Sequence, residues 1–112
     1  MNLQKEAVTP AKQLCAVDLQ KEKHILFVCT GNTCRSPMAA ALYNARYAGD
    51  GSHAFSAGLA ADGSGIAPNA AAALENAGVR STPDNPYKHH ISHTVTKADF
   101  ERAACIVAMT GA

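Results

Sequence analysis

Apolar residues gather in short runs separated by polar segments that contain glycine and proline. The run His24-Ile25-Leu26-Phe27-Val28 is rich in β-branched and aromatic residues and is apolar on both faces, as buried parallel strands are. Runs over 54–58 and 104–109 predict two further strands. The chain therefore carries at least three strand candidates, each separated from the next by enough residues for a helix.

The intervening segments have the signals of helices. Ser36-Pro37 predicts a helix start, with serine as N-cap and proline at the first helical position, and Gly49 predicts its end. An alanine-rich helix is expected over 67–78, and a third, short helix near 94–102 can be capped by Thr94 or Thr96. Strands that alternate with helices predict an α/β fold with an open parallel sheet and right-handed crossovers.

The two ends of the chain fit this pattern less well. Residues 1–23 mix charged and small apolar groups and show a helical stripe only over about 11–20, so we interpret 1–23 as an N-terminal extension or linker. Residues 24–112 are then the domain, incomplete at its C-terminus because the chain stops just after the last predicted strand. The sheet would keep an uncovered edge, which would allow self-association.

Composition narrows the classes of function. The 112 residues suit one domain, and a net charge of +1 offers no basic stripe for nucleic acid. No apolar run approaches the roughly 20 residues of a membrane span or resembles a signal peptide. We therefore expect a cytoplasmic protein whose thiols are mainly reduced, with Cys105 a small core residue. The cysteines are Cys15, Cys29, Cys34 and Cys105.

The loop between the first strand and the first helix has the composition of an anion site. Cys29 and Arg35 stand six positions apart, and small, turn-forming residues lie between them. Such a loop can direct successive backbone N–H groups inward beside a helix N-terminus, and the guanidinium of Arg35 can bind two phosphate oxygens. The same field favours the thiolate of Cys29, which could attack phosphorus and form a phosphocysteine. Ser36 can donate to the sulfur, and Asn32 tolerates a left-handed backbone.

The ten residues Val28-Cys29-Thr30-Gly31-Asn32-Thr33-Cys34-Arg35-Ser36-Pro37 resemble the signature of the low-molecular-weight protein tyrosine phosphatase family at every fixed position. The resemblance extends over about 24–112. It implies a three-layer α/β/α fold whose last strand and closing helices are missing here, and a hydrolase that needs no metal or cofactor. It also implies functional roles for individual residues: Cys29 as nucleophile, Arg35 as phosphate clamp, Ser36 as stabiliser of the sulfur anion, Thr30, Gly31, Asn32, Thr33 and Cys34 as the phosphate-binding loop, and Asn32, Ser56 and His90 as loop support.

The substrate is less sharply indicated than the chemistry. The family resemblance implies a phosphorylated protein as partner, with phosphotyrosine as the first substrate. Thr33 stands where tyrosine-directed members usually carry a bulkier aliphatic residue, and it resembles the bacterial branch that includes protein arginine phosphatases. Phosphoarginine is therefore the second substrate considered.

The family's general acid, an aspartate in an Asp-Pro-aromatic loop, has no counterpart in this chain. Asp84-Asn85-Pro86-Tyr87 is superficially similar, but it has an extra residue and precedes His90, so we interpret it as a surface turn. Loss of positioned proton transfer would slow the first step by roughly 10²–10⁴-fold. A catalytically impaired, phosphate-binding fragment is thus an alternative.

A zinc site and arsenate reduction are two alternatives to this function. The spacing of His89, His90 and His93 with the cysteines does not fit a zinc site, so no metal is expected. Thiol-dependent arsenate reductases resemble this fold and use a similar loop, but they need further resolving cysteines, and only Cys105 follows Cys34. Arsenate reduction remains the alternative enzymatic function.

Overall fold

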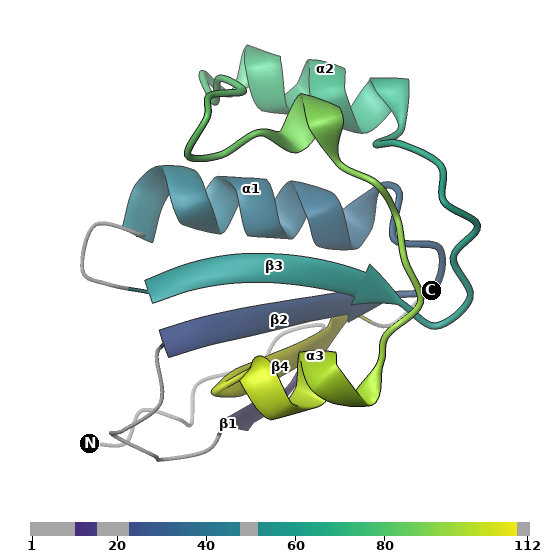
Figure 1. The fold of residues 1–112 in the computed structure, drawn as a ribbon. Helices are drawn as coiled ribbons and strands as arrows, with labels where there is room; N and C mark the ends of the chain where they lie inside the picture. The colour runs from purple at the N-terminus through teal and green to yellow at the C-terminus, as the bar shows by residue number, and fades with distance from the viewer. Residues whose placement is uncertain (1–10, 16–22, 48–51, 110–112) are drawn as a thin grey trace.

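The computed structural model describes residues 11–15, 23–47 and 52–109. Its strands form one sheet in the order β1-β4-β2-β3. The strands are β1 (Ala11–Cys15), β2 (Lys23–Cys29), β3 (Ser52–Gly58) and β4 (Cys105–Met109), and the helices are α1 (Arg35–Tyr47), α2 (Pro68–Asn76), the 3-10 turn η3 (Tyr87–His89) and α3 (Lys97–Arg102). Helices α1 and α2 lie on one side of the sheet and α3 on the other (Figure 1).

The predicted parallel sheet flanked by helices is confirmed. Strand β2 lies at its centre and pairs in parallel with both β3 and β4. Leu26 and Val28 of β2 are buried together with Ala57 of β3, and partly buried Phe55 and Ile106 pack against them. Burial on both sides explains why β2 reads as a continuous apolar run.

Strand β1 was not predicted. It pairs with β4 in the antiparallel direction, with Ala11 opposite Met109, so the helix expected over 11–20 is wrong for 11–15, and 16–20 lie outside the described residues. The β4 edge, expected to be uncovered, therefore carries a neighbouring strand. Self-association through a sheet edge stays a prediction.

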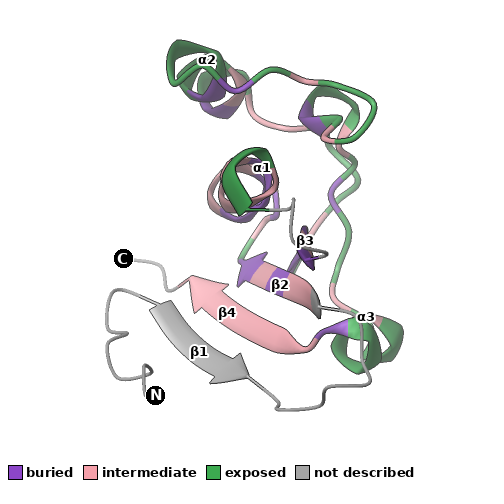
Figure 2. Ribbon diagram, turned by 90° about the vertical axis from the view of Figure 1, so that its left-hand side faces the viewer, coloured by how far each residue is buried: buried purple, intermediate pink, exposed green. Residues whose placement is uncertain are grey.

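Helix α1 separates the sheet from a second cluster of apolar residues. Ala41 of α1, Leu74 of α2, Val79 and Tyr87 are buried together, and the Tyr87 hydroxyl donates to the Val79 carbonyl at 2.6 Å. In Figure 2 the buried residues lie mainly along β2, β3 and the facing sides of α1 and α2. Because alanine side chains are small, these helices bury little apolar surface where they pack.

The helices form where the sequence signals predict them, with one correction. Helix α1 begins at Arg35, two residues before Pro37, the predicted first helical position. Ser36 therefore lies inside the helix and its prediction as N-cap is wrong; its hydroxyl contacts Cys29 Sγ instead. Gly49 lies outside the described residues. Helix α2 is confirmed. Of the two candidate caps for α3, Thr96 is the N-cap and forms a capping box with Asp99.

The composition predicted reduced cysteines and no membrane span. Cys105 is half-buried in β4 and disulfide-bonded, so its assignment as a reduced core thiol is wrong, while Cys29 and Cys34 are free thiols. Within the described ranges, no helix is long and apolar enough to cross a membrane. A cytoplasmic location stays a prediction.

Candidate active site

The cysteine-containing loop lies at the carboxyl end of the central strand. Cys29 is the last residue of β2 and Arg35 the first of α1, so the loop between them spans only residues 30–34. The β2–β3 register places Cys29 opposite Gly58, the last residue of β3. The loop is thereby fixed between the ends of two parallel strands and the start of a helix, the position at which open α/β sheets bind ligands.

Gly58 allows the loop to approach β3 closely. A Cβ at this position would lie 2.7 Å from the Thr30 carbonyl oxygen and 2.9 Å from Asn32 Cβ. Both distances are shorter than real Cβ contacts, so only glycine fits without a shift of the loop backbone. The Ser56-Ala57-Gly58 segment noted in the sequence is therefore shaped by the loop that packs on it.

The carbonyl groups of the loop are held by hydrogen bonds from neighbouring segments. Leu59 N–H donates to the carbonyls of Cys29 and Thr30, both at 2.9 Å, and Ala67 N–H donates to that of Thr33 at 2.7 Å. A trans peptide points its C=O and the following N–H in opposite directions. The N–H groups that follow these carbonyls consequently face away from the partner segments, as a nest for an anion requires.

The Cys29 sulfur is buried among hydrogen-bond donors. The residue is 4% exposed, its Sγ lies 3.0 Å from Ser36 Oγ, and Asn32 N–H donates to it at 3.3 Å. Burial alone would raise the pKa of the thiol, but hydrogen bonds from Ser36 and Asn32 and the positive charge of Arg35 outweigh it and lower that pKa. These contacts favour the thiolate form of Cys29. Its role as nucleophile stays a prediction.

Asn32 connects the loop to the rest of the domain. It is fully buried with φ of 59°, the left-handed backbone that asparagine tolerates better than most residues. Its side-chain amide donates to Ser36 Oγ at 2.8 Å and to Ser56 Oγ at 3.0 Å. The structure therefore brings Asn32, Ser36 and Ser56 together, as the family resemblance implies.

A segment that follows η3 holds Asn32 from the opposite side. His90 Nε2 lies 2.7 Å from the Asn32 carbonyl oxygen, which can only accept, so Nε2 carries the hydrogen. The main-chain N–H of His93 donates to Asn32 Oδ1 at 3.0 Å. The expected support by His90 thus has a matching contact, and the structure adds a contact from His93. Its part in the network uses a backbone group, which no sequence pattern reveals.

The remaining residues of the loop differ in exposure. Thr30 is exposed, whereas Gly31, Thr33, Cys34 and Arg35 are half-buried. The Thr33 hydroxyl lies on the Gly31 side of the loop, 3.8 Å from the position of a Gly31 Cβ.

The Asp84-Asn85-Pro86-Tyr87 segment forms a turn that leads into η3. Asn85 pairs with Thr82 across the turn, and its side-chain amide donates to the Ala41 carbonyl at 3.0 Å. Asp84 is exposed. The interpretation as a surface turn is confirmed for Asp84, whereas Tyr87 at the end of the segment is buried. Among the residues with described positions, no three His, Cys, Asp or Glu side chains gather in a way that could hold a metal ion.

Comparison with known proteins decides the family. The model of the low molecular weight phosphotyrosine protein phosphatase family matches residues 24–112. The chain belongs to this family. A protein-arginine-phosphatase of Geobacillus stearothermophilus is 41% identical over 87 residues, which are 77% of this chain and 53% of the relative. An arsenate reductase of Brevibacillus brevis is 43% identical over 61 residues, 54% of this chain and 43% of the relative.

Solved structures of the family agree with the fold. The low molecular weight protein tyrosine phosphatase from T. tengcongensis superposes with a TM-score of 0.69 and 33% identity, covering 78% of this chain and 58% of that chain. The family member described here thus spans about half the length of the curated relatives that it matches.

Proposed function

We propose that this chain carries the phosphate-binding and nucleophilic half of a protein phosphatase that works through a phosphocysteine. The observation that supports this most directly is the buried Cys29 sulfur, whose pKa is lowered by donors from Ser36 and Asn32 and by the charge of Arg35. A thiolate is the nucleophilic form of cysteine. Its position at the end of β2, in the loop that leads into the N-terminus of α1, fits a phosphoryl acceptor site.

In the proposed reaction, Cys29 Sγ attacks phosphorus, an S–P bond forms, and the ester oxygen departs with the bonding electrons. Water then attacks phosphorus, the S–P bond breaks, and inorganic phosphate and the thiolate are released. Arg35 binds the equatorial oxygens in both steps, and Ser36 donates to the sulfur anion as it departs in the second step. Because no residue of the chain matches the family's general acid, substrates with good leaving groups should react fastest.

Phosphotyrosine in proteins is the first substrate proposed, and phosphoarginine is the second. Two observations support the second: Thr33 in the loop, and a 41% identical relative described as a protein-arginine-phosphatase. Replacing Thr33 by isoleucine should raise the ratio of phosphotyrosine to phosphoarginine peptide hydrolysis. Thr30→Val is the matched control, because it alters a neighbouring, exposed threonine of the same loop.

The position of Cys105 argues against the rival reaction, arsenate reduction. Cys105 pairs with Ile25, four residues before Cys29 on β2, which places the two cysteines roughly 13 Å apart along the sheet. It is also disulfide-bonded. A cysteine at that end of the sheet does not reach the Cys29 sulfur, so Cys105 is not a suitable resolving thiol for Cys29.

The deciding experiment is hydrolysis of p-nitrophenyl phosphate by the purified chain. We expect slow turnover that Cys29→Ser abolishes, with a phosphoenzyme trapped on rapid acid quench of the unaltered protein. Orthovanadate should inhibit, and Arg35→Lys should weaken that inhibition, because lysine lacks the forked donor geometry. Hydrolysis that survives Cys29→Ser would refute the phosphocysteine route. Vanadate binding without any nitrophenol release would indicate a phosphate-binding fragment instead.

A further inference from the structure

Residues 93–95 run alongside the end of β3, next to the active-site loop. Gly58 N–H donates to the His93 carbonyl at 2.9 Å, and Val95 N–H donates to the Gly58 carbonyl at 2.8 Å. These bonds leave the His93 N–H directed at Asn32 Oδ1, 3.0 Å away. The position of the His93 backbone therefore affects how the Asn32 side chain is held.

The His93 side chain extends in the opposite direction, toward α3. Its Nε2 lies 2.9 Å from Asp99 Oδ2, the same oxygen that accepts the Thr96 N–H at 2.9 Å. Burial alone would raise the pKa of Asp99, but hydrogen bonds from Thr96 and His93 lower it. Asp99 is thus a carboxylate acceptor, and Nε2 of His93 carries the hydrogen that it accepts.

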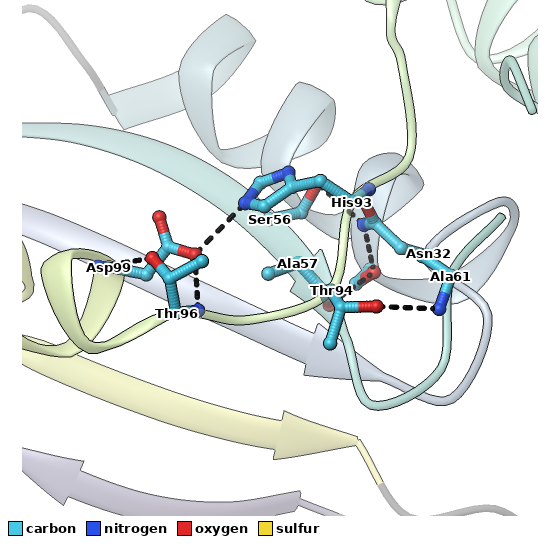
Figure 3. A network of polar contacts seen from close by, with 9 residues as sticks. Asn32, Ser56, Ala57, Ala61, His93, Thr94, Thr96 and Asp99 are labelled. Carbon is cyan, nitrogen blue, oxygen red and sulfur yellow. Dashed lines mark hydrogen bonds and ion pairs between the residues drawn. The ribbon is translucent and has the colours of Figure 1, made fainter. Parts of the chain in front are cut away.

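Figure 3 shows the resulting chain of contacts, from the capped start of α3 through His93 to Asn32. Asp99 is only 13% exposed in its side chain, whereas that of His93 is 44% exposed. Asp99 is therefore held in place by the capping box of α3. The imidazole of His93 connects Asp99 to residues 93–95, which lie beside the active-site loop.

We propose that His93 is a positioning residue for Cys29: its side-chain bond to Asp99 fixes its main-chain N–H against Asn32, and Asn32 in turn directs the Ser36 hydroxyl at the sulfur. The proposal rests on the proposed role of Cys29 as nucleophile. The path is continuous in the structure, with bonds of 2.9 Å from His93 to Asp99, 3.0 Å to Asn32, 2.8 Å on to Ser36 and 3.0 Å to the sulfur.

The test measures how fast iodoacetamide alkylates Cys29 across a range of pH, with the modified cysteine located by peptide fragmentation so that Cys34 is counted separately. In His93→Ala the backbone N–H remains but its anchor is lost. We expect the alkylation rate of Cys29 near neutral pH to fall about two- to fivefold, the range typical of one half-exposed ionic contact, and the pH midpoint to rise. His93→Arg keeps a donor that can reach Asp99 and should restore most of the rate.

Thr96→Ala is the matched control. It removes the hydroxyl that accepts the Asp99 N–H at 3.2 Å and weakens the cap of α3, but it leaves the His93–Asp99 contact in place. If His93 acts only by stabilising α3, the two variants will slow alkylation equally. If His93 positions the loop, Cys29 in Thr96→Ala will be alkylated at close to the rate seen in the unaltered protein. This should hold even if thermal unfolding shows that Thr96→Ala and His93→Ala are equally destabilised.

An unchanged rate in His93→Ala, an equal loss in Thr96→Ala, or no restoration by His93→Arg would each overturn the proposal. Alkylation needs no phosphate ester, so it reports on Cys29 whether or not the chain turns over a substrate. Failure of the proposed hydrolysis would instead appear as normal alkylation without release of nitrophenol.

Discussion

The Asn32 side-chain amide donates to Ser36 Oγ at 2.8 Å, while that oxygen lies 3.0 Å from Cys29 Sγ. A hydroxyl has one hydrogen, and the amide occupies one of its lone pairs. The hydrogen is therefore left for the sulfur, because the other acceptor in range, the Ala57 carbonyl, is farther away at 3.5 Å. A buried asparagine thus determines which way the serine donates.

Replacing Ser36 by alanine should raise the pKa of Cys29. A hydrogen bond to a charged group contributes about 1.5–3 kcal/mol, which corresponds to about one to two pKa units. The pH dependence of iodoacetamide alkylation measures the change. Ser56→Ala is the control, because Ser56 bonds to Asn32 at 3.0 Å but is not among the groups that shift the thiol. An equal rise in both variants would show that general loosening, rather than the Ser36 hydroxyl, is responsible.

Replacing Asn32 should lower the free energy of unfolding for two separable reasons. Asn32→Gly keeps the left-handed backbone at φ of 59° and removes only the buried side-chain bonds to Ser36, Ser56 and the His93 N–H. We expect a loss of about 2–4 kcal/mol in the free energy of unfolding, because buried partners are left unsatisfied. Asn32→Ala should cost about 1 kcal/mol more through backbone strain. Urea denaturation gives the free energy of unfolding of both variants, and the difference between them is the cost of backbone strain. Equal losses in the two variants would argue against strain.

Gly58→Ala tests the close approach between β3 and the loop. The added methyl would lie 2.7 Å from the Thr30 carbonyl oxygen, so the loop backbone must move, at a typical cost of about 1–3 kcal/mol, and phosphate should bind more weakly. Gly63→Ala is the control: Gly63 has φ of 86° but no atom within 4 Å of the added Cβ, so it should lower stability without weakening phosphate binding. Isothermal titration with phosphate separates the two.

Stability should depend on pH through Cys29. Its pKa is lower in the folded protein than in the unfolded chain, so between these two values the unfolded state binds more protons, and stability rises with pH. The contribution is complete above the ordinary thiol pKa and is lost as pH falls through the lowered one. Cys29→Ser removes this dependence. The difference in unfolding temperature between the unaltered protein and Cys29→Ser should therefore widen as pH rises from the lowered to the ordinary thiol pKa. A difference that stays constant with pH would contradict the lowered pKa.

Local sequence signals predicted the central part of this fold well. The apolar run over 24–28 predicted β2, and the Ser36-Pro37 pair predicted a helix in the right place, although α1 begins at Arg35 and Ser36 is not its N-cap. Of the two threonines considered as caps of α3, Thr96 is the N-cap. For β2 and α3 the signal is the local physical cause of the element: burial on both faces of the strand, and a side chain that satisfies a free N–H.

The elements that were missed depend on contacts distant in sequence. Residues 11–15, AKQLC, form β1 because they pair with β4 nearly a hundred positions later, and nothing in five mixed residues specifies that partner. His93 supports Asn32 with a main-chain N–H, a group that almost every residue type has. The disulfide at Cys105 likewise depends on which chain segment lies beside β4.

The contacts of Asn32 have a practical consequence. This one side chain receives or makes bonds with the start of α1, with β3 and with the segment beyond η3, so the sulfur can be highly reactive only while all three are correctly assembled. The speed with which Cys29 reacts with a simple alkylating agent is therefore a gauge of native assembly. It allows folded and partly opened forms of the chain to be counted in a mixture, even where no enzymatic turnover is detectable.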